Sequence, residues 1–174
     1  DATTSGKFKR EIAPVTIKSR KGETVVDIDQ LPREAKPDKI PQLRPAFSKD
    51  GTVTAANASA ISDGAAALVL MKKSEAEKRG LKPIATIVSS SSHAHEPEYF
   101  TTAPVPAMQK ALAKAGWGVD EVELWEVNEA FAVVPMIAMK EMGISHEKLN
   151  VNGGACAMGH PIGASGARLI VTLL

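Results

Sequence analysis

From Gly51 onward, short runs of apolar residues alternate with segments whose apolar residues recur at helical spacing. The runs predict four strands of a sheet, at Gly64 to Met71, Ile84 to Ser90, Val122 to Val127 and Leu149 to Asn152. Helices are expected between them, at Ser74 to Gly80, Pro106 to Ala115 and Glu129 to Met142, with a final helix after the glycine-rich loop that follows. This alternation is typical of an α/β fold with right-handed crossovers and a parallel or mixed sheet.

The ends of these helices carry sequence signals. Ser74 and Glu77 form the S-x-x-E pattern of a capping box, which predicts the start of the first helix. Gly80 and Gly116 are expected to end the first and second helices, because glycine adopts the left-handed conformation that is common at helix C-termini. The third helix is expected to present one apolar face, made of Phe131, Val134, Ile137 and Ala138.

The first 50 residues differ in composition from the rest, being polar and rich in proline, lysine and aspartate. Ile12 to Lys18 and Glu23 to Ile28 predict two short strands joined by a turn. From Gln30 to Asp50, prolines with basic residues between them indicate an ordered loop or linker. We therefore expect residues 1–50 to be the end of a loop region and residues 51–174 to be the main domain.

The composition of the chain excludes several classes of protein. The chain has 174 residues, of which 44% are hydrophobic, so a globular protein with a real core is expected. A formal net charge of +1 argues against a broad nucleic-acid or membrane surface, and no apolar run is long enough to span a bilayer. A single cysteine excludes an internal disulfide. The chain begins with a residue other than methionine and ends in an apolar segment that is expected to form a helix without a cap. We therefore expect it to belong to a longer polypeptide.

The most distinctive segment is Asn150 to Arg168 (NVNGGACAMGHPIGASGAR), which places five glycines around one histidine. Glycines let the backbone approach a ligand or another backbone closely, because no Cβ stands in the way. Pro161 fixes its own φ and biases His160 toward an extended conformation. Such a stiff loop is a sensible platform for a catalytic base, and a structural histidine is the alternative.

Other polar residues can be explained by a structural role as well as by a functional one. Asn128, between a predicted strand and helix, would serve as an N-cap, and Thr52 to Ser62 would be a polar turn. Cys156 precedes His160 by four residues, but the glycine and proline beside the histidine disfavour a helix that would join them. A small buried hydrophobe is therefore the favoured interpretation of Cys156. No spacing of His, Cys and Asp indicates zinc, and the glycines do not follow the dinucleotide-binding pattern.

In combination, three segments closely resemble the thiolases. They are Asn128 to Ala132 (NEAFA), Gly153 to Gly163 (GGACAMGHPIG) and Gly51 to Gly64 (GTVTAANASAISDG). The resemblance covers essentially the whole chain and is greatest to the biosynthetic branch, the acetyl-CoA C-acetyltransferases. A lipid-transfer relative carries a His-Asp pair where this chain has Asn-Glu, which favours a true thiolase. The resemblance implies a layered αβαβα fold of two similar α/β halves, of which this chain would be most of the second, truncated before its end.

The resemblance also implies a mechanism. A cysteine in the family's first half is acylated, and His160 would withdraw the proton of that thiol. Asn128 would hold a water that forms an oxyanion hole together with His160. A second family cysteine, in a C-x-G-G-G turn, removes the α-proton of the second acetyl-CoA. Cys156 aligns with neither family cysteine, so the chain alone is expected to be inactive.

Coenzyme A would contact a further set of residues. The resemblance places Ala55 and Ser59 near its pantetheine arm. It places two basic residues, Arg33 and Lys39, near the adenosine-phosphate end, and Ala130 and Phe131 along the acyl pocket. The CoA thioester would be the substrate, and no cofactor or metal is implied.

These features lead us to expect an acyltransferase that condenses two acetyl-CoA to acetoacetyl-CoA plus CoA through an acyl-cysteine, and that catalyses the reverse thiolysis. A degradative 3-ketoacyl-CoA thiolase is the alternative within the family, and a non-catalytic CoA-binding or assembly fragment is the alternative of another class. Expected partners are the CoA substrates, an N-terminal half with the nucleophilic cysteine, and further copies in a homodimer or homotetramer. No nucleic acid or membrane partner is expected. The expected location is the cytoplasm, with an organelle matrix as the alternative.

Overall fold

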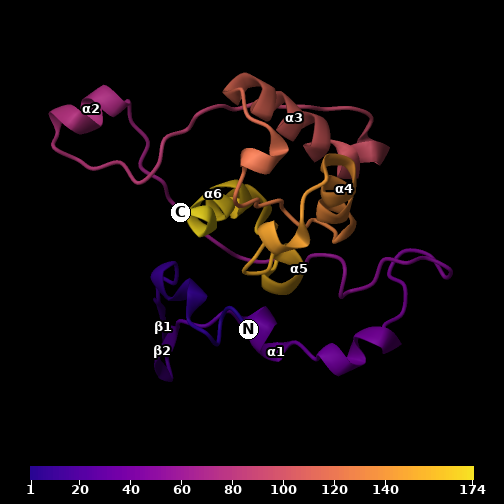
Figure 1. Ribbon diagram of the computed structural model, residues 1–174. Coiled ribbons are helices and arrows are strands. Elements are labelled where there is room, and N and C mark those ends of the chain that lie inside the picture. Colours follow the sequence, from indigo (N-terminus) through magenta and orange to yellow (C-terminus); the bar gives the residue numbers. More distant parts are fainter.

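A computed structural model describes residues 1–174 and divides them into a helical body and an N-terminal arm. The body contains α3 (Pro104–Ala115), α4 (Val133–Met142), α5 (Ala155–Met158) and α6 (Ile162–Leu173). The arm contains β1 (Val15–Ser19), β2 (Gly22–Val26) and α1 (Gln30–Glu34), and it runs along one side of the body (Figure 1). Helix α2 (Lys73–Lys78) lies apart from both on a long loop (Figure 1). Short 3-10 helices occupy Lys7–Arg10, Pro37–Gln42, Pro97–Thr102, Val119–Glu121 and His146–Lys148.

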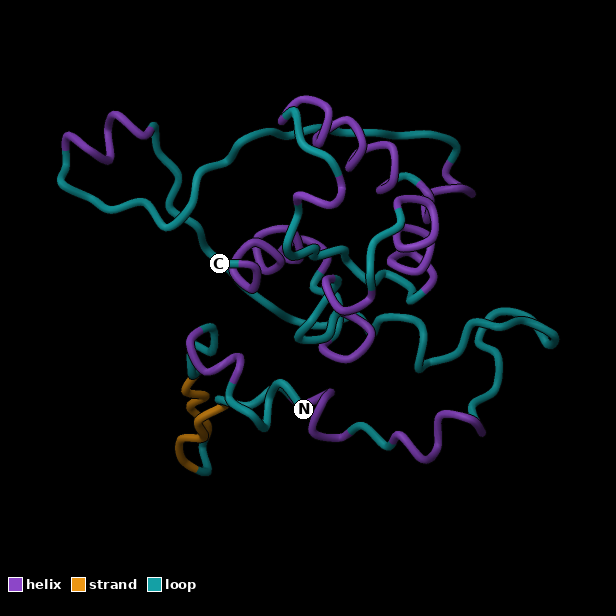
Figure 2. The backbone as a smooth tube through the Cα atoms, in the orientation of Figure 1, coloured by secondary structure: helices purple, strands orange, loops and turns teal.

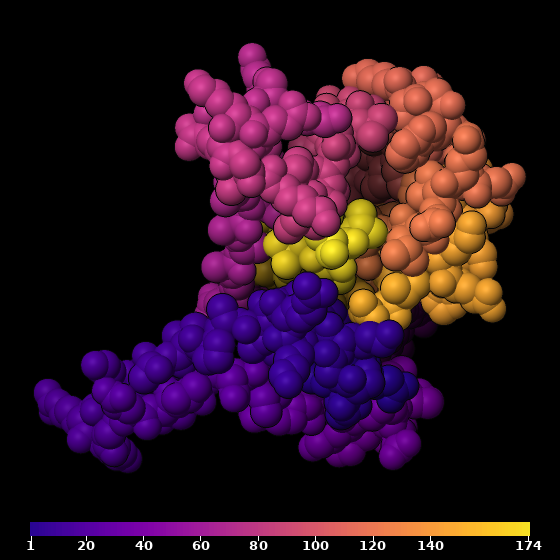
Figure 3. Space-filling model, turned by 60° about the vertical axis from the view of Figure 1, so that its left-hand side comes forward, coloured from indigo at the N-terminus to yellow at the C-terminus, as the bar shows by residue number.

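The predicted hairpin in the first 50 residues is confirmed. Strands β1 and β2 pair antiparallel, with Val15 opposite Val26 and Ser19 opposite Gly22. Gly22 has a φ of 119°, a conformation that glycine adopts without the steric cost of a Cβ. Side chains along both strands are exposed, and Figure 3 shows the indigo hairpin as a projection from the body.

One apolar cluster forms the centre of the body. It joins α4 to the segments before and after it through Trp125, Val127, Val134, Ile144 and Leu149. Met108 and Leu112 of α3 pack against this cluster from the side. Burial of these side chains is the main favourable term that fixes α3 and α4 against the residues that lead into the site.

Two of the four predicted strands come together in parallel, as the alternation indicated. Trp125 and Leu149 form a parallel bridge, in which the N–H of Trp125 donates to the carbonyl of Lys148 at 2.8 Å. The N–H of Asn150 in turn donates to the carbonyl of Trp125 at 2.9 Å. The pairing stops after this bridge, so the segments are shorter than Val122 to Val127 and Leu149 to Asn152.

The other two predicted strands, residues 64–71 and 84–90, are wrong as strands. Neither segment pairs with another backbone segment, and Figure 2 shows both regions as extended loops. Apolar residues stay uncovered there, with Val69 86% and Ile84 83% exposed. An apolar run becomes a strand only when a neighbour supplies ladder partners, and residues 84–90 instead reach α3 through side chains such as Ser89, whose hydroxyl donates to the carbonyl of Ala111.

Helix starts also differ from the expectation. The prediction of a capping box at Ser74 and Glu77 is wrong, because α2 begins at Lys73 and no side chain caps it. The helix predicted from Glu129 begins only at Val133, so Asn128 is not its N-cap. Residues 130–132 are held instead by residues 57–59, since the N–H of Ser59 donates to the carbonyl of Ala130 and the N–H of Ala132 to that of Asn57.

Helix ends agree better with the sequence. Gly80 and Gly116 have φ values of 66° and 72°, so both adopt the left-handed conformation expected after a helix. The C-terminal helix α6 is tied to the arm, because the hydroxyl of Thr172 donates to the carboxylate of Glu11 at 2.7 Å. None of the helices combines the length and apolar character that crossing a lipid bilayer requires.

We predict that Leu149→Ala lowers the free energy of unfolding of the 174-residue chain by about 2–5 kcal/mol, because it removes buried methyl groups from the central cluster. Leu124→Ala is the matched control, because Leu124 is 46% exposed, and its cost should stay below about 1 kcal/mol. Urea unfolding followed by circular dichroism measures both values. Equal costs for the two substitutions would show that the cluster is not the stabilising core.

Candidate active site

The glycine-rich loop lies against the polar segment that contains Ser59. The N–H of His160 donates to the carbonyl of Ala60 at 2.8 Å, and Ile61 and His160 form a parallel bridge. Within Thr52 to Ser62, the side chain of Asn57 accepts from the N–H of Thr54 at 2.7 Å, which is the turn that the plain interpretation predicted. This turn also carries Ser59 to the segment after Asn128, because the Ser59 hydroxyl donates to the carbonyl of Ala130 at 2.9 Å.

Asn128 and His160 meet, although 32 positions separate them in the chain. The amide nitrogen of Asn128 lies 3.3 Å from Nε2 of His160. The other ring nitrogen, Nδ1, lies 2.6 Å from the hydroxyl of Ser165, which is buried in the second turn of α6. The imidazole is therefore held at both nitrogens by uncharged side chains.

These contacts favour one tautomer of the neutral ring. The Ser165 hydroxyl also lies 3.1 Å from the carbonyl of Pro161, an acceptor to which it donates its single proton. It then accepts from Nδ1–H of His160, which leaves Nε2 unprotonated and facing the amide N–H of Asn128. In this arrangement Nε2 is the nitrogen available to take a proton.

Ser165 is a site residue that the sequence did not reveal. It follows His160 by five residues, in a run of small residues that gave no reason to separate it from Ser62 or Ser145. The signal present in the sequence is the spacing Pro161-x-x-x-Ser165, since a serine one turn into a helix bonds back to the carbonyl four residues earlier. Only burial and the 2.6 Å contact give that hydroxyl a role in the site.

A small pocket opens beside the imidazole. Its volume is about 240 Å³, and it is lined by Ser59, Ala60, Ile61, Ala130, Phe131, His160 and Ile162. The structure thus brings four of the predicted site residues together around one cavity. The carboxamide oxygen of Asn128 is buried and has no protein donor, so it can accept a hydrogen bond from a bound group.

A larger pocket, of about 320 Å³, is lined in part by Asn128 and shares Ala130 with the smaller one. Most of its lining is apolar, with Phe100 and Met108 among the contributors, and Glu126 is its one acidic residue. Burial raises the pKa of the Glu126 carboxyl to about 7, and the negative charges of Glu129 and Glu11 reinforce the shift against the opposing charge of Arg168. The Glu126 carboxyl in the lining of this pocket therefore changes between its neutral and negative forms close to neutral pH.

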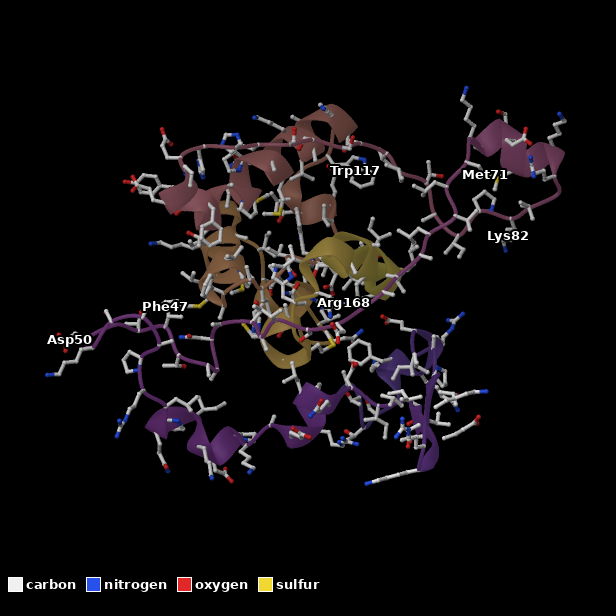
Figure 4. All side chains as sticks on the ribbon, turned by 180° about the vertical axis from the view of Figure 1, so that it is seen from behind. Phe47, Asp50, Met71, Lys82, Trp117 and Arg168 are labelled. Atoms are coloured by element: carbon white, nitrogen blue, oxygen red, sulfur yellow. The ribbon has the colours of Figure 1, made fainter.

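Two aromatic residues that the sequence did not single out surround Phe131. Phe47 lies edge-on to it, with ring centroids 6.3 Å apart, and the ring of Phe100 is tilted relative to it, with centroids 6.1 Å apart. Phe47 comes from the extended arm, where Figure 4 shows it near Asp50, and it is 77% exposed. Aromatic rings at these separations attract each other, so they position Phe131 at the edge of the smaller pocket.

Cys156 is not a partner of His160. It lies in the one-turn helix α5, which ends at Met158, and Gly159 with a φ of 84° redirects the chain before His160. Its thiol points to the carbonyl of Glu129 at 3.8 Å. Burial raises the pKa of the Cys156 thiol to about 11, and the nearby charge of Glu129 adds to the shift. The half-buried thiol thus stays protonated, in line with the non-nucleophilic interpretation.

Three predicted site residues are not brought to the pockets. Ala55 is exposed on the turn, Arg33 is exposed on α1, and Lys39 is exposed in the 3-10 turn that follows. Arg33 makes only a loose ion pair with its neighbour Glu34 at 4.0 Å. Helix α1 itself packs against α5, so Arg33 belongs to an element that borders the glycine-rich loop.

Comparison with known proteins identifies the family of this chain. The family model described as the thiolase N-terminal domain matches residues 1–74, and the model for the thiolase C-terminal domain matches residues 81–174. The junction between the two falls on α2 and the turn after it, and the boundary expected at Gly51 stays a prediction. The chain is 53% identical to the cytosolic acetyl-CoA acetyltransferase of Mus musculus, over 99% of this chain and 44% of that protein.

Solved structures give the same result for the fold. The acetyl-CoA acetyltransferase of Bacillus anthracis matches with a TM-score of 0.94 and 44% identity, and human mitochondrial 3-ketoacyl-CoA thiolase matches with 0.87 and 36%. Each covers 99% of this chain, which spans 44% of theirs. Predicted from the sequence as an α/β protein of the layered thiolase type, this chain has the thiolase fold and belongs to the thiolase family.

Proposed function

We propose that this chain is part of an acyltransferase that condenses two acetyl-CoA to acetoacetyl-CoA plus CoA, and that catalyses thiolysis in reverse. The observation that carries the proposal is the contact between Asn128 and His160 beside the pocket that Ser59, Ala130 and Phe131 line. Relatives that are half identical to this chain bear the name acetyl-CoA acetyltransferase, which supports the same reaction.

The proposal assigns the reacting thiols to other parts of the whole protein. This chain spans 44% of the length of the relatives, and its one cysteine has a thiol that burial keeps protonated. The nucleophilic cysteine and the cysteine that removes the α-proton therefore lie outside the 174 residues. On this proposal, His160 and Asn128 supply one wall of the site, and the chain alone does not turn over.

In the first half of the reaction, Nε2 of His160 takes the proton of the nucleophilic thiol. The thiolate attacks the thioester carbon of acetyl-CoA, and the bond to the CoA sulfur breaks. The departing CoA thiolate takes the proton of the second cysteine, which leaves an acetylated cysteine, a second cysteine in the thiolate form, and His160 with the proton on Nε2. The tautomer favoured by Ser165, with Nε2 unprotonated, is the form that begins this sequence.

In the second half, the second cysteine removes a proton from the α-carbon of another acetyl-CoA. Negative charge develops on its thioester oxygen, and His160 and a water bound by Asn128 stabilise that charge. The α-carbon then attacks the acetyl-cysteine, the carbon–sulfur bond breaks, and acetoacetyl-CoA forms. In this step Nε2 of His160 carries the proton that it took from the nucleophilic thiol, and it returns that proton to the nucleophilic cysteine when the carbon–sulfur bond breaks. The Ser165 hydroxyl suits this protonated ring, because it accepts from Nδ1–H while it donates to the carbonyl of Pro161.

Coenzyme A would approach the site across the segments that surround the smaller pocket. Ser59, Ala130 and Phe131 line that pocket, which supports their proposed contacts with the pantetheine arm and the acyl group. Ala55 is proposed to contact the pantetheine arm further out. Arg33 and Lys39 are proposed for the adenosine-phosphate end, since both are exposed cations on the arm of the chain.

A degradative 3-ketoacyl-CoA thiolase is the second candidate, because the human mitochondrial enzyme of that name shares the fold at 36% identity. The comparison that separates the two is the ratio of kcat/KM for acetoacetyl-CoA and for a longer 3-ketoacyl-CoA. A ratio well above one supports the condensing enzyme, and a ratio well below one supports the degradative one. We further propose a homodimer or homotetramer, and a cytoplasmic location, as the name of the mouse relative suggests.

His160→Ala in the complete natural polypeptide should lower kcat/KM for thiolysis of acetoacetyl-CoA by about 10²–10⁴-fold, the usual worth of a general base. Ser165→Ala should lower it by about tenfold, because the ring loses its orientation. His146→Ala is the control, since that histidine is exposed in a 3-10 turn. Thiolysis is measured by loss of the acetoacetyl-CoA absorbance. Full activity of the His160 variant would rule out the proposed role.

Arg33→Ala in the complete polypeptide should raise the KM for the CoA substrate about fivefold and leave kcat nearly unchanged, because an exposed charge contact is worth about 1 kcal/mol. Arg20→Ala, in the exposed turn of the hairpin, is the matched control. An unchanged KM in the Arg33 variant would argue against contact with the adenosine-phosphate end.

Alkylation of Cys156 in the 174-residue chain should be slow at pH 8 and accelerate up to about pH 11, because the thiolate is the reactive form and the pKa of this thiol is raised to about 11. Unfolding in urea should restore the rate of an ordinary cysteine. Iodoacetamide modification followed by mass spectrometry measures both rates. A rate that already levels off below pH 9 would show that Cys156 is an activated thiol.

A further inference from the structure

The carboxylate of Glu129 bonds to the glycine-rich loop through both of its oxygens. Oε1 accepts from the side-chain amide of Asn150 at 3.0 Å, and Oε2 accepts from the N–H of Cys156 at 3.0 Å. Glu129 follows Asn128 directly, and Cys156 precedes His160 by four residues. One carboxylate thus links the two segments from which the Asn128–His160 pair comes.

Asn150 completes this link on the other side of Asn128. Its side-chain oxygen accepts from the N–H of Val127 at 2.8 Å, and its side-chain nitrogen donates to the carbonyl of Val127 at 2.8 Å. Asn150 is buried and has a φ of 48°, a left-handed conformation that asparagine tolerates better than most residues. Its side chain therefore acts as the next partner in the ladder that the Trp125–Leu149 bridge begins.

Gly154 provides the room that the carboxylate occupies. A Cβ at this position would overlap the carboxyl group, with the two Glu129 oxygens at 2.5 and 2.6 Å from it. The backbone of Gly154, with φ −145° and ψ −162°, is extended and open to any residue. The carboxylate, and not the backbone conformation, thus requires glycine here.

From these contacts we infer that Glu129, Asn150 and Gly154 form a positioning clamp that sets the distance between Asn128 and His160. Val127 and Glu129, the two neighbours of Asn128, are hydrogen-bonded to the side chain of Asn150. The backbone that carries the carboxamide of Asn128 is therefore held in place. The bond from Glu129 to the N–H of Cys156 fixes the loop that leads to His160. This role rests on the proposed function, because it concerns the two side chains that the proposal places at the thioester.

The clamp requires a carboxylate in particular. Both oxygens of Glu129 face N–H donors, and an ionised carboxyl group is the side chain that accepts on both sides. A glutamine would turn its NH2 group toward one of these donors and lose that bond. An aspartate keeps the charge but is one methylene shorter, so it cannot reach both donors without moving the backbone.

Glu129→Gln in the complete polypeptide is the first test. We expect kcat for thiolysis to fall about 10–100-fold while KM changes less than about threefold, because a small misplacement of reacting groups affects turnover more than binding. Glu141→Gln, an exposed glutamate of α4, is the control. Glu129→Asp should show a smaller loss than Glu129→Gln. A kcat unchanged in Glu129→Gln, or lowered only in proportion to the folded fraction seen by circular dichroism, would overturn the inference.

The second test is a double-mutant cycle of Glu129→Ala and Gly154→Ala. Gly154→Ala alone should lower kcat at least about tenfold, but in the Glu129→Ala background it should add less than about threefold, since the overlapping carboxyl group is gone. Gly118→Ala is the control glycine, because it is exposed and nothing lies closer to its Cβ position than 3.5 Å. Additive effects of the two substitutions would contradict the clamp.

A structural readout separates this inference from the proposed function. In crystals of the wild type, Asn128 Nδ2 and His160 Nε2 should remain near 3.3 Å apart, and in Glu129→Gln the distance should exceed about 4 Å. A wild type without thiolysis activity but with this structural response would refute the function and retain the clamp. An unchanged distance in the variant would refute the clamp whatever the activity.

Discussion

The geometry of the candidate site depends on the buried hydrogen bonds that join residues 125–129 to the loop after Leu149. Buried N–H and C=O groups must be paired, and here only one strand-like bridge is available to pair them. The side chain of Asn150 takes over where that bridge ends and satisfies both backbone groups of Val127. The chain can therefore turn at Asn128 without leaving unpaired groups, and its carboxamide is directed at the imidazole.

The same hydrogen bonds give the imidazole of His160 and the thiol of Cys156 different surroundings. His160 contacts only the neutral groups of Asn128 and Ser165, so its Nε2 stays available for proton transfer. Cys156 is instead half-buried, which raises the pKa of its thiol to about 11, and the nearby carboxylate of Glu129 adds to the shift. Burial thus keeps the single thiol of this chain protonated, and the carboxylate that bonds to the loop reinforces this effect. This outcome agrees with a reaction whose nucleophile comes from elsewhere in the protein.

The sequence predicted side chains that meet in the structure better than it predicted the strands of the sheet. The specific pattern around His160 and the Asn-Glu pair led to two side chains that the structure places 3.3 Å apart. Residues 64–71 and 84–90 have the composition of strands, but composition does not say whether a partner strand is present to pair with them. Ser165 and Asn150 were not predicted because each acts through a contact made by the tertiary fold, and the spacing of Pro161 and Ser165 indicates only a bond to the helix backbone.

Membership in the thiolase family, together with the relatives' names, directs the account to a CoA thioester held at His160 and Asn128. The most direct measurement is a crystal structure of the complete polypeptide with acetyl-CoA bound. We predict that the thioester oxygen lies within about 3.2 Å of His160 Nε2 and of a water that Asn128 holds. A well-ordered thioester bound more than about 6 Å from both side chains would contradict it.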